Sequence, residues 1–445
     1  MNSAVAQALS DAGMGEAQAR NKASLFAAAD QQLKQWCDSE PLRWFVPGRI
    51  EVLGKHTDYA GGRSLLCTAE RGFCICAVPR SDAMLRITDI VRHSRFECII
   101  SRGLAIPGSG WTVYPSVVAR RLARNFAEPL HGADIAFASD LPSAAGMSSS
   151  SALVVAIFAV LSEVNCLSER TEYVANVQSA LDLAAYLSCI ENGQTFRSWI
   201  GAGGVGTFGG SEDHTAILAS DPGRLKQFSF CPVHHERTVA VPRDCVFVIA
   251  VSGVIADKTG SAKTRYNQAS LMVQEILRYW RATTGMETAT LAEAVNSSVD
   301  APDRIRAAIR RASPTFTEGK ALVDRFDQFW LESEQIIPAA SEALARGDLA
   351  TFGELTAQSE QAAESLLCNQ VSETIQLVKS ARKHGAYAAS AFGAGFGGSV
   401  WALVARDAAT DFVRCWRHKY EFTFPAVAGT SQFFMTNSGP ALHRL

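Results

Sequence analysis

Three separated segments rich in glycine and serine carry residue types suited to binding phosphates and polyhydroxyl compounds. They lie at residues 47–62 (PGRIEVLGKHTDYAGG), 141–151 (LPSAAGMSSSS) and 392–399 (FGAGFGGS). The middle segment runs directly into an apolar stretch, residues 152–161, that predicts a helix. Backbone N–H groups at a helix start point outward and carry the positive end of the helix dipole. This segment is therefore a candidate phosphate-binding loop.

The serine loop has two features that favour a ligand. Gly146 allows the backbone to approach a ligand closely, and the hydroxyls of Ser148, Ser149, Ser150 and Ser151 are available to a phosphate or a metal ion. The loop is not a P-loop, because it lacks the GxxxxGK[ST] pattern. An ordinary helix N-cap with surplus serines remains an alternative.

Charged side chains are concentrated in the first segment. Arg49, Lys55, His56 and Asp58 lie within ten residues of one another, between glycines. Such a cluster supplies several donors and acceptors to a polyhydroxyl substrate. A solvated loop is the alternative interpretation of any one of these residues alone.

A further candidate is Asp213, in the sequence GGSEDH at residues 209–214. The preceding glycines, Gly210 among them, suit a place where the backbone must pass a bulky ligand. An aspartate beside a substrate hydroxyl accepts its proton during phosphoryl transfer. A turn-forming aspartate is the alternative.

Composition limits the class of protein. The chain has 445 residues, 47% of them hydrophobic and 19% charged, with a net charge of −2, which is typical of a globular protein with two or three domains. No basic stripe is visible, so we expect no nucleic-acid partner. The longest apolar run is too short to span a bilayer, so we expect no membrane partner. The eleven scattered cysteines form no CxxC pair and predict free thiols of a cytoplasmic protein, with Cys74 and Cys76 on one face of a strand.

The hydrophobic pattern predicts a mixture of helices and strands. Helices are expected at 3–36, 113–126 (with a basic outer face of Arg120, Arg121 and Arg124), 152–164, 171–191, through most of 261–383, and at 408–420. Strands are expected at 42–52, 64–78, 84–100 (a hairpin), 133–138, 215–219, 227–231, 245–251, 399–404 and 432–436. A change in composition near 220–245 favours a domain boundary there.

Taken together, the three segments resemble the motifs of the GHMP small-molecule kinases, and within them those of the galactokinase branch. That branch opens with PGRxNLxGEHTDYxGG, which residues 47–62 match at most positions. The family's LPxGxGLSSSA and GAGFGG motifs are matched by residues 141–152 and 393–398. The first motif is specific to the branch, whereas the other two identify only the superfamily.

The resemblance implies a two-domain α/β (α+β) fold with a cleft between the domains. The N-terminal domain, residues 41–235, would resemble the second domain of ribosomal protein S5. The C-terminal domain, residues 236–445, would be ferredoxin-like, and residues 1–40 would be a helical extension. The implied reaction is ATP-dependent phosphorylation of the anomeric C1 hydroxyl of galactose or a galactose-like sugar, with Mg²⁺ as cofactor, by a monomer or weak oligomer.

The resemblance also implies roles for single residues. Asp213 matches the proposed catalytic base and Arg49 the active-site arginine. The sugar would contact Lys55, His56, Asp58, Gly210 and Tyr266. ATP would contact Gly146, Ser148, Ser149, Ser150, Ser151, Gly395 and Gly397. Mg²⁺ would be held by Glu191 together with Ser149 or Ser150.

The chain departs from the family pattern in two places. Lys55 replaces the glutamate of GEHTD, which in the family is associated with the C6 hydroxyl of the sugar. An ammonium group at that position would suit a carboxylate at C6, so a uronic acid such as galacturonate is an alternative substrate; a Lys55 that points to solvent would leave a neutral sugar. The second departure is that Glu191 and Asp213 are 22 positions apart, which is farther than in the family. The extra residues are expected to reshape the sugar pocket or form a lid.

Two other functions were weighed. A non-catalytic sugar sensor on a kinase fold is disfavoured because Arg49, Glu191, Asp213 and the serine loop all persist. A mevalonate or homoserine kinase is disfavoured because those branches lack the HTDY segment.

Overall fold

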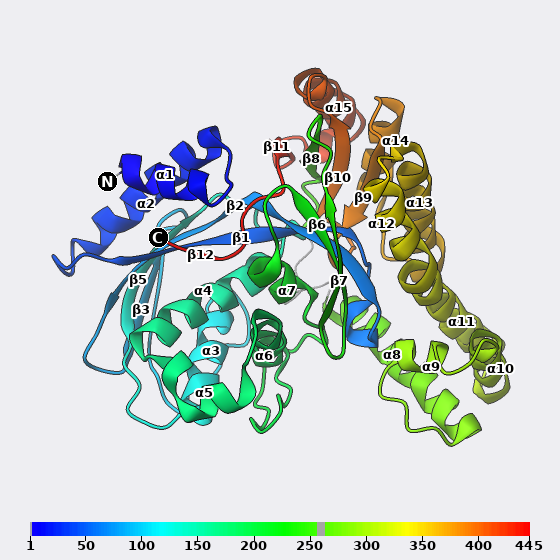
Figure 1. Ribbon diagram of the computed structural model, residues 1–445, viewed down its shortest axis with the longest axis horizontal. Coiled ribbons are helices and arrows are strands. Elements are labelled where there is room, and N and C mark those ends of the chain that lie inside the picture. Colours follow the sequence, from blue (N-terminus) through cyan, green and yellow to red (C-terminus); the bar gives the residue numbers. More distant parts are fainter. Residues whose placement is uncertain (1, 256–262) are drawn as a thin grey trace.

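Two β-sheets and the helices packed on them make up the computed structural model, which describes residues 2–255 and 263–445 (Figure 1). The expected mixed α/β fold is confirmed. The first sheet contains β1 (Leu42–Leu53), β2 (Arg63–Pro79), β3 (Met84–Asp89), β4 (Ser94–Ile99), β5 (Ala133–Ser139), β6 (Arg224–Ser229), β7 (His234–Ala240) and β12 (His443–Arg444). The second contains β8 (Cys245–Val251), β9 (Ala388–Phe392), β10 (Ser399–Ala405) and β11 (Gln432–Thr436).

The first sheet has the order β12-β1-β2-β5-β3-β4, and β6 and β7 extend from β2. Only β3 and β5 are parallel; the other pairs are antiparallel. One face is covered by α1 (Asn2–Asp11) and α2 (Glu16–Leu33). The other face carries α3 (Val113–Asn125), α4 (Ser149–Val164), α5 (Thr171–Asn176), α6 (Ala180–Asn192) and α7 (Glu212–Ala219).

The second sheet is antiparallel throughout, in the order β11-β8-β10-β9. Residues of β8 alternate between two cores because successive side chains of a strand point to opposite faces. Val246 and Val248 face α14 (Ser372–Lys383) and α15 (Ala409–Thr423), whereas Phe247 and Ile249 belong to the core shared with α12 (Ile337–Ala345) and α13 (Leu349–Ala362). Both faces of this sheet are therefore buried.

A separate helical lobe follows the second sheet's first strand, at the lower right of Figure 1. It consists of α8 (Lys263–Thr284), α9 (Leu291–Val295), α10 (Ala301–Ala312) and α11 (Phe316–Trp330). Trp280, Phe326 and Phe329 are at its core, and Tyr59 and Ala60 of the first segment pack against it. The lobe is thereby attached to the loop that follows β1. Residues 261–262, where the helical stretch was expected to begin, lie outside the described residues.

Two of the expected elements differ from the structure. Residues 215–219 are not a strand but belong to α7, where Glu212 and Asp213 occupy the first turn and favour a helix N-terminus. The helix expected at 171–191 is broken into α5 and α6, because Ser179 caps the second helix. Strands β7 and β9 were not expected. Arg121 is buried rather than on an outer face, and it donates hydrogen bonds to the carbonyls of Gln194 and Trp199.

The chain passes from the first sheet to the second between Ala240 and Cys245, and strand β12 then returns to the first sheet, where Trp44 pairs with Arg444. The domain limits 1–40, 41–235 and 236–445 stay a prediction. Within the described ranges, every helix is too short or too polar to cross a lipid bilayer.

The N-terminal helices are part of the core rather than a loose appendage. Phe26 of α2 is buried against β2 and β5, in the cluster that contains Cys74 and Cys76. These two thiols lie on the same face, as expected, and point at backbone carbonyls of α2. Lys22, which is completely buried, donates to Asp140 at 2.5 Å.

We predict that Phe26→Ala lowers the free energy of unfolding by about 3–5 kcal/mol, because it removes a buried aromatic ring and leaves a cavity. Chemical denaturation of the full chain measures this change. Ser24→Ala, on the exposed side of the same helix, is the control and should have little effect. Equal stabilities of the Phe26 variant and the parent would show that α2 is not part of the folding unit.

Candidate active site

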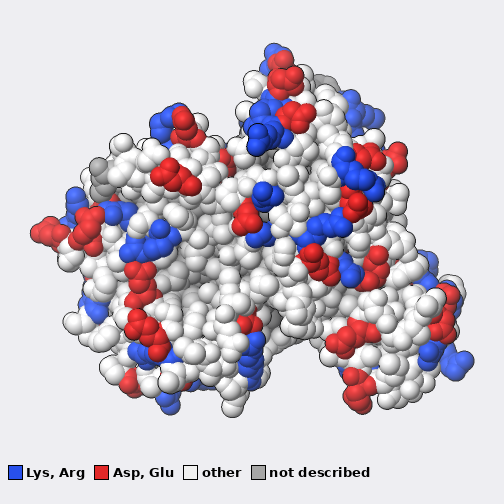
Figure 2. Space-filling view, in the orientation of Figure 1, with Lys and Arg blue, Asp and Glu red and all other residues white. Residues whose placement is uncertain are grey.

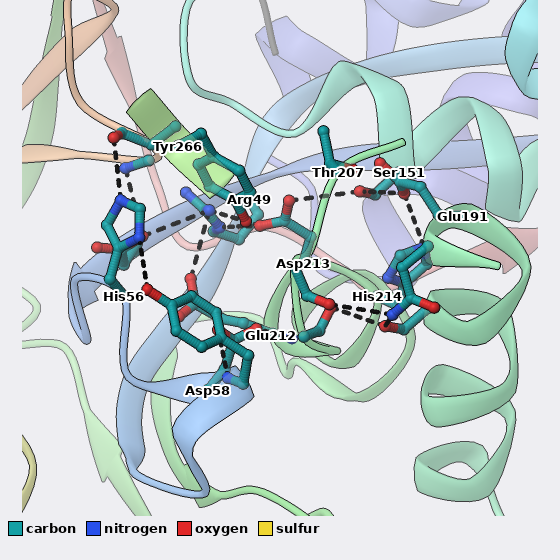
Figure 3. Close-up of a pocket in the computed structure, with 18 residues that line it drawn as sticks. Arg49, His56, Asp58, Ser151, Glu191, Thr207, Glu212, Asp213, His214 and Tyr266 are labelled. Atoms are coloured by element: carbon teal, nitrogen blue, oxygen red, sulfur yellow. Dashed lines mark hydrogen bonds and ion pairs between the residues drawn. The ribbon is translucent and has the colours of Figure 1, made fainter. Parts of the chain in front are cut away.

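Parts of the chain that are far apart in sequence meet in one polar pocket between the two sheets and the helical lobe (Figure 3). The contributing segments are the end of β1 and the loop after it, the starts of α4, α7 and α8, the end of α6, and the glycine loop after β9. The pocket is lined by Arg49, Glu51, His56, Asp58, Tyr59, Ser151, Ser188, Glu191, Asn192, Thr207, Gly209, Gly210, Glu212, Asp213, His214, Tyr266, Gly393 and Ala394.

The pocket contains a buried ion pair between Arg49 and Asp213. Arg49 Nε and Nη2 lie 2.8 and 2.5 Å from Asp213 Oδ1. Arg49 Nη1 also donates to the carbonyl of Gly146 in the serine loop, 3.2 Å away. A bulge in β1 next to Arg49 allows its backbone N–H to reach the carbonyl of Met147. The two residues thus link β1, α7 and the serine loop.

Two more carboxyl groups approach the same guanidinium. Arg49 Nη2 is 3.4 Å from Glu51 Oε2 and 3.3 Å from Glu212 Oε1. Burial lowers the pKa of Arg49, but the charges of Asp213, Glu212 and Glu51 outweigh burial and raise it above its usual value. Burial raises the pKa of Glu51 and raises that of Glu212 well above the usual range. The arginine therefore stays charged, and the surplus acids favour a proton.

Ser151 connects Asp213 to Glu191. Its hydroxyl lies 2.8 Å from Glu191 Oε2 and 3.3 Å from Asp213 Oδ2. On the other side of Glu191, Nε2 of His214 is 3.2 Å from the same carboxylate oxygen. Among the described residues Ser151, and not Ser149 or Ser150, is the serine hydrogen-bonded to Glu191, and the expected metal ligands stay a prediction.

The donor set at Glu191 and Ser151 fits a magnesium ion chemically. Both provide hard oxygen ligands, and Mg²⁺ in nucleotide sites takes one or two protein oxygens and completes its shell with water and phosphates. The described residues hold no cluster of three or more His, Cys, Asp or Glu side chains able to bind a metal by themselves. A protein-only metal cage is therefore not what this site provides.

His56, Asp58 and Tyr266 form the other wall of the pocket (Figure 3). His56 contacts the hydroxyl of Tyr59 and the carbonyl of Ala394, at 2.9 and 3.0 Å, and its ring centroid is 5.2 Å from that of Tyr266. Burial raises the pKa of Tyr266 well above its usual value, so its hydroxyl remains a donor. These groups offer hydrogen bonds to a ligand in the pocket.

Gly210 lies in this wall for a steric reason. Asp58 Oδ2 accepts a hydrogen bond from the N–H of Glu212 at 3.1 Å, which brings the loop after β1 close to the backbone before α7. A Cβ on Gly210 would lie 2.5 Å from that same oxygen. The glycine is therefore required by close packing, and it lines the pocket as well.

Lys55 is not among the residues that line the pocket, so the structure does not support its expected role as a sugar ligand. Its side chain is almost completely buried and donates to Ser390 at 2.6 Å and Ser359 at 3.1 Å, with Glu360 Oε2 3.6 Å away. It points neither to the sugar nor to solvent, but between α13 and β9. Burying an ammonium group is costly unless a carboxylate is near, and Glu360 meets that requirement.

A second cavity of about 340 Å³ lies on the other side of the serine loop. Its walls are aromatic (Phe73, Trp111, Tyr114 and Phe137), and Gly146, Ser148, Ser149 and Ser150 form its edge. Ser148 has the positive φ of 58° just before α4, and no described residue hydrogen-bonds to its buried hydroxyl. An aromatic cavity ending at a helix N-terminus suits a base at one end and phosphates at the other.

The glycines of the third segment do not reach this cavity, so Gly395 and Gly397 are not placed as the expected ATP contacts. A Cβ on Gly395 would collide with Asn369, and one on Gly397 with Val254. The segment instead packs against the serine loop at Ala145 and Gly146. Ser399 Oγ donates to the carbonyl of Ala145 at 2.6 Å, and Gly393 lies directly against Gly146.

The insertion between Glu191 and Asp213 first packs against α6 and then borders the pocket. Phe196 and Trp199 pack with Tyr186 in an aromatic cluster, and Val205 N–H donates to the carbonyl of Glu191. Beyond it, Asn267 of α8 is hydrogen-bonded to Gly206 and Phe208. The insertion therefore connects α6 to α8, and Thr207 and Gly209 become part of the pocket wall.

Glu51, Glu212 and His214 line the pocket although the sequence did not predict it, and the same holds for the aromatic residues of the second cavity. Glu51 could have been recognised as a candidate, because it is the one charge in an otherwise apolar stretch between Ile50 and Leu53. Trp111 and Tyr114 had none, since aromatic side chains near a helix start are ordinarily core residues.

Three protein-family descriptions match the chain. They are the galactokinase galactose-binding signature over residues 34–79, the GHMP kinases N-terminal domain over 113–192 and the GHMP kinases C-terminal description over 340–421. The galactokinase of Chloroflexus aggregans is 27% identical over 373 residues, covering 83% of this chain and 85% of that one. The galactokinase of Lactiplantibacillus plantarum is 26% identical over 384 residues, covering 85% and 89%.

Among solved structures, the chain is similar to the galactokinase of Lactococcus lactis complexed with galactose. The TM-score is 0.76 at 24% sequence identity, and the match covers 95% of this chain and 100% of that one. This likeness agrees with the two-sheet fold described above. The family descriptions and the relatives agree with the three motifs: the chain belongs to the GHMP kinases, in the galactokinase branch, and is a phosphotransferase with an alcohol group as acceptor.

Proposed function

We propose that this protein transfers the γ-phosphoryl group of ATP to the anomeric C1 hydroxyl of galactose or a galactose-like sugar. The observation that carries the proposal is the Arg49–Asp213 pair, which lies between the polar pocket and the serine loop. The relatives named above are galactokinases, and the similar solved structure is complexed with galactose. The sugar would occupy the pocket beside Asp58, His56 and Tyr266.

ATP would lie across the serine loop. Its base would enter the aromatic cavity beside Trp111 and Tyr114, and its phosphates would meet the N–H groups at the start of α4 and the hydroxyl of Ser148. Arg49, which touches both Asp213 and the carbonyl of Gly146, would lie between the nucleotide and the sugar. Its positive charge would favour the negative charge of the transferring group.

In the reaction, the C1 oxygen forms a bond to the γ-phosphorus while the bond from that phosphorus to the β–γ bridging oxygen breaks, so that ADP leaves. The proton of the C1 hydroxyl passes to a carboxylate oxygen of Asp213. Arg49 beside it would favour the ionised form of that carboxylate beforehand, because a neighbouring positive charge favours the charged form of an acid. Mg²⁺ bound at Glu191 and Ser151 would neutralise charge on the phosphates.

The uronic acid alternative depended on an ammonium group in the pocket. Because Lys55 is paired with Glu360 outside it, no observation favours that alternative over a neutral sugar. A sugar sensor is likewise not favoured, since the chain is a phosphotransferase.

The direct test is a substrate panel of galactose, glucose and galacturonate with ATP, followed by ADP release, for the parent and for Lys55→Met. We expect galactose to be the best of the three for both proteins. The variant should lose about 3–5 kcal/mol of stability, because Glu360 is left as a buried unpaired charge. Lys55→Met combined with Glu360→Met is the matched control and should recover much of that loss. A galacturonate preference that disappears in Lys55→Met would restore the uronic acid hypothesis.

For Asp213→Asn we expect kcat to fall by about 10²- to 10⁴-fold, the usual contribution of a general base. ATP binding, measured by calorimetry, should persist, because the aromatic cavity is untouched. Asp221→Asn, which changes an exposed carboxylate paired with Lys226, is the control. A folded Asp213 variant with near-parental kcat would remove this residue from the base role.

Glu191→Gln should raise the Mg²⁺ concentration needed for half-maximal activity by about 10-fold or more, because an amide oxygen is a weaker ligand than a carboxylate. Ser151→Ala should shift the same titration in the same direction, whereas Ser150→Ala should not. Unchanged metal dependence in both Glu191→Gln and Ser151→Ala would contradict the assignment. A shift in Ser150→Ala alone would restore the assignment expected from the sequence.

A further inference from the structure

Three carboxyl groups surround the guanidinium of Arg49, and only one of them has a role in the proposed reaction. Asp213 takes the short bonds from Nε and Nη2. Glu51, on the same strand as Arg49, and Glu212, which precedes Asp213 in α7, lie at 3.4 and 3.3 Å from Nη2. Glu51 and Glu212 are 4% and 5% exposed, so water does not screen their charges.

Each of these glutamates has one satisfied and one unsatisfied oxygen. Glu51 Oε2 accepts from the N–H of Gly393 at 3.3 Å, and Glu212 Oε2 accepts from Ser64 Oγ at 2.7 Å. The Oε1 atoms of both residues are buried and receive no hydrogen bond from any described residue. Both carboxyl groups lie within 3.4 Å of the same Nη2 atom, so each is a close neighbour of the other. Two facing acceptors form a hydrogen bond only if one of them carries a proton.

The positive charges near Glu51 and Glu212 are already paired with other carboxylates, so they do not neutralise these two glutamates. Arg49 is already matched by Asp213, and the ammonium group of Lys55, whose charge also acts on Glu51, is matched by Glu360. Asp58, from the loop after β1, adds a further negative charge beside Glu212. Glu332 accepts a hydrogen bond from the N–H of Gly54, and Nε2 of His214 lies 3.2 Å from Glu191 Oε2. Burial accordingly raises the pKa of both glutamates, although Arg49 and Lys55 oppose this for Glu51.

We propose that Glu51 and Glu212 share one proton between their Oε1 atoms, and that this singly charged pair is a positioning element that holds Arg49 against Asp213. With one proton the pair carries one negative charge behind Nη2 and a hydrogen bond that fixes both side chains. Without the proton, two like charges would repel each other and compete with Asp213 for the same guanidinium. The catalytic part of this proposal rests on the proposed function; the shared proton does not.

The geometry distinguishes the two amide variants. In Glu51→Gln, the amide oxygen takes the place of Oε2 opposite Gly393, and the amide N–H₂ replaces Oε1 and donates to Glu212. This variant imitates the protonated pair permanently. In Glu212→Gln, the carbonyl oxygen keeps the hydrogen bond from Ser64 only if the N–H₂ group points at Arg49 Nη2, where donor opposes donor; with the amide reversed, the bond donated by Ser64 is lost. The same change of one atom should therefore have different effects at the two positions.

The kinetic test is the pH profile of kcat for ADP release. We expect the parent to lose activity on the alkaline side as the shared proton leaves. Glu51→Gln should retain more of the neutral-pH kcat than Glu212→Gln does, and its alkaline limb should move up by about one pH unit or more, because an amide does not lose its proton. Glu212→Gln should lose kcat at all pH values. Identical alkaline limbs in the parent and Glu51→Gln, or equal losses in the two variants, would overturn the positioning role.

A stability test addresses the shared proton without using activity. Because the folded pKa is raised above the unfolded value, folding takes up a proton between the two pKa values. The parent's stability against unfolding therefore falls as pH rises through that window, by up to tenfold in the unfolding equilibrium constant per pH unit for one proton. Glu51→Gln should lack this decline, so its stability relative to that of the parent should increase from acid to neutral pH. Parallel pH dependences for the two proteins would show that no proton is shared.

Infrared difference spectra give a direct readout. The carbonyl stretch of a protonated carboxyl group should be present in the parent near neutral pH and absent in Glu51→Gln and in Glu212→Gln. Glu70→Gln is the matched buried control: Glu70 accepts hydrogen bonds from Gly15 and Asn437, far from the pocket, and this variant should keep the band. A band that persists in both pocket variants would refute the shared proton. Failure of the parent to phosphorylate galactose would contradict the proposed function and leave the stability and infrared outcomes valid.

Discussion

The ion pair of Arg49 and Asp213 is the interaction on which the arrangement of the site depends. Its partners are 164 positions apart, one at a bulge in β1 and the other in the first turn of α7. A buried guanidinium is tolerated only where carboxylates compensate its charge, so the fold must bring these two elements together accurately. Ser151, Gly146 and Asp58 are placed by their contacts with this pair and its immediate neighbours.

Two separate groups of buried charges lie in and near the pocket. Lys55 and Glu360 neutralise each other between α13 and β9, whereas Arg49 is paired with acids that line the pocket. Figure 2 shows the contrast with the outer surface, where groups of both signs are interspersed and the face is hollowed between the main body and the helical lobe. Charged side chains outside are screened by water and contribute little, whereas those inside determine which proton and which substrate the site favours.

Much of the fold could be predicted, because periodic hydrophobicity is a local property. Strands β1, β2, β5, β8, β10 and β11 and helices α2, α3, α4 and α15 follow directly from it. The short stretch at 215–219 was ambiguous, since five mostly apolar residues fit a strand or a buried helix equally well. Strand β9 consists largely of alanine and serine, which lack any strand preference, and only its pairing with β10 makes it a strand.

The sequence by itself determined the family, the three glycine-rich segments and the residues Arg49, Asp213 and Glu191, because motifs preserve residue type and spacing along the chain. The tertiary structure decided where each side chain points. Lys55 lies outside the pocket, and Ser151 rather than Ser149 or Ser150 is hydrogen-bonded to Glu191. Gly395 and Gly397 pack against Asn369 and Val254, and Glu51 and Glu212 both lie beside Arg49. These outcomes depend on contacts between residues distant in sequence, and a pattern of neighbouring residues carries no information about them.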